Sequence, residues 1–132
     1  MNIGFFARHF SERGSEIAIY DYAHYNEEIL GNKSYIICFT ELKQKQIGFY
    51  SGRISYQKFS SRFPVIEINN IHKMKKIIED FNLSFFYTLT HGGKDIYCFD
   101  NKKIWGNCKT IKHCVFVTTY PEGDYYISIS NH

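Results

Sequence analysis

Short, sparsely charged apolar runs alternate along this chain with amphipathic segments, and this alternation most limits the folds open to it. Each run is typical of a strand buried on both faces of a sheet. The runs occupy residues 2–7, 33–39, 63–69, 83–90, 110–119 and 124–130. Strands that alternate with helices predict an α/β fold, here a Rossmann-like three-layer domain with a mostly parallel sheet flanked by helices.

Two of the intervening segments show helical periodicity. In the first, Ser15 is a suitable N-cap, Glu16 places a negative charge in the first turn, and Gly31 and Asn32 mark the end. Its apolar stripe consists of Ala18, Ile19, Tyr22, Ala23, Tyr25, Ile29 and Leu30. The second helix is indicated by apolar residues at helical spacing, namely Ile71, Met74, Ile77, Ile78 and Phe81. Residues 41–60 are mostly polar and predict no element.

Size and charge exclude several classes of protein. The 132 residues predict a single domain, and a hydrophobic fraction of 44% excludes a disordered chain. The net charge of +3 is small for a nucleic-acid-binding protein. No run is long enough to span a membrane, and no signal segment precedes the first strand. We therefore expect neither a nucleic-acid partner nor a membrane span.

The four cysteines, Cys38, Cys98, Cys108 and Cys114, form no Cys-x-x-Cys pair. Cys38 and Cys114 lie inside apolar runs, where a thiol packs as a small hydrophobic group. We therefore expect a reducing, cytoplasmic compartment and no metal site.

Polar and glycine-containing segments follow two of the predicted strands. The loop from Arg8 to Gly14 leaves the first strand and enters a helix N-terminus, which favours anions. His91, Gly92 and Gly93 follow the strand at 83–90. Because ligands bind at the carboxyl ends of parallel strands, both segments should open on one rim of the sheet. Solvated loop charges, a plain helix N-terminus and a glycine turn explain the same segments without a ligand.

Single side chains near the predicted strand ends are further candidates. His113 lies in an apolar run, where a histidine is commonly a satisfied core residue. Asp95, Glu122 and Asp124 lie near strand ends, but their spacing demands no acid–base chemistry. Trp105 has no partner motif, which favours packing in the core or at its rim.

Four segments together resemble one group of proteins. They are RGSEIAIYDYAHYNEEILGNKSYI (13–36), GGKDI (92–96), KTIKHCVF (109–116) and PEGDYYISIS (121–130). These segments are similar, in the same order, to the opening part of glycosyltransferases from bacteria and large DNA viruses, which resemble the retaining family four of the GT-B architecture. The likeness runs from Asn2 to Ser130 and is weakest across residues 41–60.

The resemblance implies that residues 1–132 are the N-terminal, acceptor-side half of such an enzyme, and that a C-terminal donor-binding lobe is missing. The whole enzyme would move a sugar from a nucleotide-sugar donor to a glycan or sugar acceptor. The transfer would retain the anomeric configuration and need no metal or other cofactor. The half by itself is expected to be inactive.

The resemblance also suggests which residues form the site. His113 is the catalytic candidate and would hydrogen-bond the donor sugar or its phosphate, while the departing phosphate takes the proton of the acceptor. Substrate would be bound by residues in or next to the matched segments, namely Arg13, Gly14, Ser15, His91, Gly92, Gly93 and Glu122.

Two departures from the group favour an alternative, a non-catalytic Rossmann-like binding module derived from such an enzyme. Glu122 stands where the group often has His, and Ile96 stands where it commonly has Gly. A receiver or flavodoxin-like domain is disfavoured because the loop after the first strand is basic. The chain ends directly after a predicted strand, so we expect the missing lobe, or a second copy of the chain, to cover an open side of the sheet.

Overall fold

The computed structural model of the chain describes residues 1–8, 10, 14–48, 52–90, 96–114 and 121–128. The strands are β1 (Asn2–Phe6), β2 (Lys33–Phe39), β3 (Val65–Ile68), β4 (Leu83–Thr90), β5 (Lys109–Cys114) and β6 (Tyr125–Ser128). The helices are α1 (Gly14–Glu28), α2 (Glu41–Gln46), α3 (Arg53–Arg62), α4 (Met74–Phe81) and α5 (Lys102–Trp105), with a 3-10 turn, η1 (Ile71–Lys73), directly before α4.

The six strands form one sheet with the order β3-β2-β1-β4-β5-β6, and all neighbours are parallel. The chain begins in the middle with β1, adds β2 and β3 on one side, and then crosses over to add β4, β5 and β6 on the other. This is the strand order of a doubly wound, Rossmann-like sheet. The predicted α/β class, with a parallel sheet flanked by helices, is confirmed.

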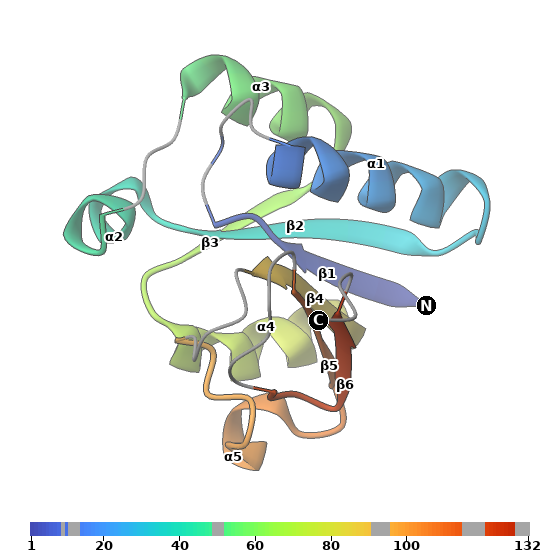
Figure 1. The fold of residues 1–132 in the computed structure, drawn as a ribbon, viewed down its shortest axis with the longest axis vertical. Helices are drawn as coiled ribbons and strands as arrows, with labels where there is room; N and C mark the ends of the chain where they lie inside the picture. Colours follow the sequence, from blue (N-terminus) through green and yellow to red (C-terminus); the bar gives the residue numbers. More distant parts are fainter. Residues whose placement is uncertain (9, 11–13, 49–51, 91–95, 115–120, 129–132) are drawn as a thin grey trace.

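Helices lie on both faces of the sheet (Figure 1). α1 and α3 cover one face, called the α1 face below, and α4 and α5 lie on the opposite α4 face. Each face has its own buried apolar core. Core residues on the α1 face include Phe5, Ala7, Ile19, Ile36 and Phe59, and those on the α4 face include Phe6, Ile37, Phe86, Tyr97 and Trp105. The packing of Trp105 in a core agrees with its interpretation from the sequence.

The central strand β1 joins the two cores. Phe5 packs on the α1 face and Phe6 on the α4 face, because successive side chains of a strand point to opposite sides. Gly4 sits at a point of close approach: a Cβ there would lie 2.7 Å from Cδ1 of Ile37 and 3.2 Å from Cδ1 of Leu83. Its missing side chain lets β1 fit between its two neighbours.

Two helices begin within residues 41–60, for which the pattern predicted no element. α2 is capped by Thr40, whose hydroxyl accepts a hydrogen bond from the Lys43 backbone N–H. α3 is mostly polar, and its buried Phe59 packs edge-on against Phe10 with ring centroids 5.2 Å apart. Such helices depend on capping and on tertiary contacts, so their sequences lack a strong apolar period.

The first helix differs in detail from its prediction. α1 begins at Gly14 rather than after an N-cap at Ser15. Ile19 and Ala23 of the predicted apolar stripe are buried, whereas Ile29 follows the end of the helix and is 73% exposed. The stripe therefore contacts the sheet only over the first part of its predicted length.

The α1 face of β5 and β6 remains partly exposed. Tyr125 and Ile127 of β6 expose 51% and 43% of their surface. In the sheet, Tyr125 pairs with Ile111 of β5, and Ile127 pairs with His113. Among the described residues, no helix is both long and apolar enough to cross a bilayer.

Replacing Gly4 should destabilise the sheet. We expect Gly4→Ala to lower the free energy of unfolding by about 1–3 kcal/mol, because the added methyl group overpacks the contact with Ile37. Ser60→Ala, at an exposed position of α3, is the control and should change stability little. Equal urea midpoints for the two variants would show that the contact can relax.

Candidate functional site at the carboxyl edge of the sheet

The carboxyl ends of β1, β4 and β5 meet at one edge of the sheet. β4 pairs directly with both β1 and β5, and all three strands are parallel. The connection after β1 runs toward β2, whereas the connection after β4 runs toward β5, so the strand order reverses between β1 and β4. Ligands of open α/β sheets bind at such a reversal. Here the guanidinium of Arg8 donates to the Thr90 hydroxyl over 3.4 Å, so the ends of the two strands are in contact.

The N-terminus of α1 belongs to the same edge, because a crossover helix runs antiparallel to the strands that it connects. Gly14 and Ser15 occupy its first two positions, so the helix starts earlier than an N-cap at Ser15 would place it. Glu16 follows in the first turn and is only 3% exposed. Its carboxylate already lies near the positive end of the helix dipole, so an anionic ligand would share that end with Glu16.

His113 forms a compact aromatic cluster with two tyrosines on the α1 face. Its Nδ1 is hydrogen-bonded to the hydroxyl of Tyr87 on β4. Tyr87 lies two residues before Leu89, the residue that pairs with His113 in the sheet. The Tyr22 ring of α1 stacks on the imidazole with centroids 6.4 Å apart and planes at 26°. Tyr22 also meets Tyr87 edge-on at 5.9 Å. Two strands and one helix therefore hold the imidazole in place.

The protonation of this pair follows from its burial. Burial lowers the pKa of His113, and burial together with the nearby Tyr22 raises the pKa of Tyr87. Both groups are neutral near neutral pH. We assign the Tyr87 hydroxyl as the donor to Nδ1 and the imidazole proton to Nε2, because Nδ1 is the one acceptor that the described residues offer to this hydroxyl. The buried Nε2 has no hydrogen-bond partner in the described part of the chain. It is an N–H donor that an acceptor oxygen of a ligand would satisfy.

Glu122 occupies a different environment from His113. Its carboxylate accepts a hydrogen bond from Nζ of Lys112 over 3.0 Å, and the Lys112 side chain is fully buried. Lys112 precedes His113 in β5, so the two side chains point to opposite faces of the sheet. The structure therefore places Glu122 on the α4 face, where it neutralises a buried lysine, and not beside His113.

Asp124 ties the start of β6 to β5. Its carboxylate accepts hydrogen bonds from the backbone and hydroxyl of Thr110, at 2.9 and 3.2 Å, and pairs with Lys102 at 3.2 Å. Burial alone would raise the pKa of Asp124, but the bonds from Thr110 and Lys102 lower it overall. These contacts make Asp124 a structural residue.

Several candidates lie outside the described residues. They are Arg13, His91, Gly92, Gly93 and Asp95. Thr90, which directly precedes His91, is at the carboxyl edge of β4 beside Arg8. Thr90, two residues after Thr88 on the α4 face, meets Arg8 at this edge, whereas His113 lies on the α1 face near the end of β5.

The two tyrosines were missed by sequence analysis. Tyr22 was assigned to the apolar stripe of the first helix, and Tyr87 to a buried strand. The alternation of side chains along a strand was an available signal, because it places Tyr87 and His113 on the face opposite to that of their immediate neighbours. Only the register between β4 and β5 reveals that they meet.

The described cysteines are reduced and mostly buried. Cys38, Cys98, Cys108 and Cys114 form no disulfide. Burial, aided by a nearby carboxylate, raises the pKa of Cys38 and of Cys108 to about 12, so both thiols stay protonated. Among the described residues, no three His, Cys, Asp or Glu side chains are grouped as a metal site would require.

Comparison with known proteins adds no relative: no family model, curated protein or solved structure matches this chain.

Breaking the Lys112–Glu122 pair should be costly. Glu122→Gln leaves a buried ammonium without its carboxylate, and we expect a loss of about 3 kcal/mol in the free energy of unfolding. Adding Lys112→Met should recover most of this loss. Glu41→Gln breaks the exposed pair with Lys45 and is the control, with an expected cost of no more than about 0.5 kcal/mol. A cost for Glu122→Gln as small as that of the control would exclude a structural role.

The burial of His113 should make stability depend on pH. Because the pKa of His113 is lowered below 6.5 in the folded protein, the unfolded chain takes up a proton first. The associated stability is complete above about pH 6.5 and is lost as the pH falls through this value toward the folded pKa. Thermal midpoints measured from about pH 7.5 to about pH 5.5 should fall more steeply for the wild type than for His113→Gln. Parallel curves would contradict the assignment.

Proposed function

We propose that this chain is the acceptor-side half of a retaining glycosyltransferase of the GT-B type, which works with a donor-binding lobe. The observation that carries the proposal is the cluster of His113, Tyr87 and Tyr22 near the carboxyl edge of the sheet, on the strands next to the point where the strand order reverses. The motif resemblance adds a reaction class to this geometry.

The aromatic cluster suits a sugar. Tyr22 is 44% exposed, so part of its ring is open to a ligand, while its other contacts fix its orientation on His113 and Tyr87. Aromatic rings supply apolar contact area, and a few placed donors fix the orientation of a ligand. A sugar ring has both apolar C–H faces and hydroxyl oxygens. The ring of Tyr22 and Nε2–H of His113 offer one partner for each.

The proposed reaction needs no general base from this lobe. The bond between the anomeric carbon and the diphosphate oxygen breaks, and the acceptor hydroxyl attacks the same face of the sugar. The departing diphosphate takes the proton of that hydroxyl. Neutral His113 contributes as a hydrogen-bond donor through Nε2, and the cation of Arg8 favours negative charge at the edge.

One observation favours the second candidate, a non-catalytic binding module. Glu122 lies within a motif that the resemblance connects with substrate, yet its carboxylate neutralises the buried Lys112. A module that keeps the sheet and the aromatic cluster would still bind a glycan. The two candidate functions predict different results when a donor-binding lobe is added. The half-enzyme would then transfer sugar, whereas the binding module would not.

A binding screen tests the proposal. Nucleotide sugars and simple glycans are titrated into the chain and followed by amide NMR. We expect a saturable ligand whose affinity falls roughly tenfold in Tyr87→Phe, because the imidazole loses the bond that fixes its proton on Nε2. Tyr25→Phe makes the same change at an exposed position of α1 and should bind normally. His113→Ala and Arg13→Ala should bind weakly.

Activity assays complete this test. The 132 residues alone should transfer no sugar, because in this proposal they supply only the acceptor side of the site. Rapid transfer by these 132 residues would exclude the half-enzyme assignment. Failure to bind any sugar, or equal binding by Tyr87→Phe and Tyr25→Phe, would exclude the site.

A further inference from the structure

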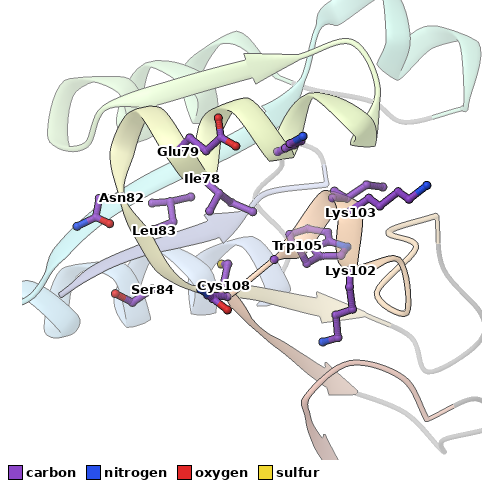
Figure 2. A pocket seen from close by; sticks show the side chains of 13 residues that line it. Ile78, Glu79, Asn82, Leu83, Ser84, Lys102, Lys103, Trp105 and Cys108 are labelled. Carbon is purple, nitrogen blue, oxygen red and sulfur yellow. The ribbon is translucent and has the colours of Figure 1, made fainter.

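A second site is suggested by a pocket at the opposite edge of the sheet. The pocket has a volume of about 580 Å³ and lies between α4 and α5, beside the amino ends of β4 and β5. In Figure 2, Ile78 and Glu79 of α4 face it from one side, and Lys103 and Trp105 of α5 lie on the other. This volume is within the range of small-molecule sites.

Positive charge dominates the wall of this pocket. Lys75 of α4 and Lys102 and Lys103 of α5 all line it, against one carboxylate, that of Glu79. Lys102 pairs with Asp124 outside the pocket. Neither Lys75 nor Lys103 has an ion-pair partner among the described residues. Two cations from separate helices therefore share one pocket with a single carboxylate, that of Glu79, which pairs with neither of them.

Uncharged donors lie beside these cations. Asn82, Ser84 and Asn107 line the pocket, and their side chains make no hydrogen bond within the part of the chain that the structure describes. Asn82 has a left-handed backbone with φ 51° and ends α4. The pocket thus combines ammonium, amide and hydroxyl groups that are all open to a ligand.

The floor of the pocket is apolar and buried. Trp105 is fully buried, and its indole N–H donates to the backbone oxygens of Tyr97 and Cys98, each at 3.0 Å. Leu83 and Cys108 are also buried beneath the pocket. An apolar floor lowers the local dielectric constant, so the field of the lysines above it is less screened than on a flat surface.

We propose that this pocket binds a small phosphate ester that carries free hydroxyl groups. Lysine ammonium groups bind phosphate as point charges, which fits Lys75 and Lys103. The hydroxyl groups of the ester would meet the amides of Asn82 and Asn107 and the carboxylate of Glu79. The site is separate from the carboxyl edge, and it does not depend on the function proposed for that edge.

The test uses the whole chain and three probes: glycerol 3-phosphate, inorganic phosphate and glycerol. Binding is followed by amide NMR shifts at the residues that line the pocket and by the fluorescence of Trp105, the single tryptophan. We expect saturable shifts with glycerol 3-phosphate, weaker binding of inorganic phosphate, and none with glycerol. Added salt should weaken the binding through screening.

A matched pair of double variants distinguishes a specific site from non-specific electrostatic attraction to the lysines. Lys75→Gln with Lys103→Gln should weaken binding roughly tenfold or more, because two charge-assisted hydrogen bonds are lost. Lys73→Gln with Lys76→Gln removes the same charge from neighbouring exposed positions that do not line the pocket, and it should bind normally. Both double variants should keep the thermal midpoint of the wild type.

Three results would overturn the proposal. One is an equal loss of affinity in the two double variants. Another is equal binding of phosphate and its ester, and the last is a shift that never saturates.

Discussion

The parallel pairing of β1 on both sides is the interaction on which the rest of the structure depends. β1 lies between β2 and β4, and it sends Phe5 and Phe6 into the two separate cores. Gly4 allows this close fit, since a side chain there would meet Ile37. Because β4 is aligned on β1, and β5 on β4, the same pairing fixes which side chains reach the carboxyl edge. The candidate site thus depends directly on the packing of one short strand.

β5 shows how one strand serves two purposes. Lys112 points into the α4 face and pairs with Glu122, whereas the next residue, His113, points into the α1 face and meets Tyr87. The ion pair and the aromatic cluster are adjacent along the chain but separated by the sheet. A residue can therefore lie close to the site in sequence while its side chain pairs on the other face of the sheet, as Glu122 does with Lys112.

Much of the fold could be predicted because strands buried on both faces appear as continuous apolar runs. β2 and β4 have the bounds that the sequence predicted. α2 and α3 could not be predicted, because they depend on the Thr40 cap and on tertiary contacts of residues such as Phe59.

The site was harder to predict than the sheet. His113 was identified, but its partner Tyr87 was not, since an aromatic residue in an apolar run is equally suited to a core. The partner of Glu122 was hidden for a related reason: nothing in the sequence marks Lys112 as a buried charge. Both contacts are between residues brought together by strand register or by a turn, which sequence pattern alone does not fix.

The strand order has a consequence for how the chain is made. β1 leaves the ribosome before the other strands of this sheet, but one of its two neighbours, β4, begins only at Leu83. Until that segment emerges, the nascent sheet of β1, β2 and β3 ends at β1 with unpaired backbone groups and with Phe6 lacking its contact with Phe86. The strand that is central in the finished molecule is thus an open edge during synthesis, and unpaired strand edges favour aggregation.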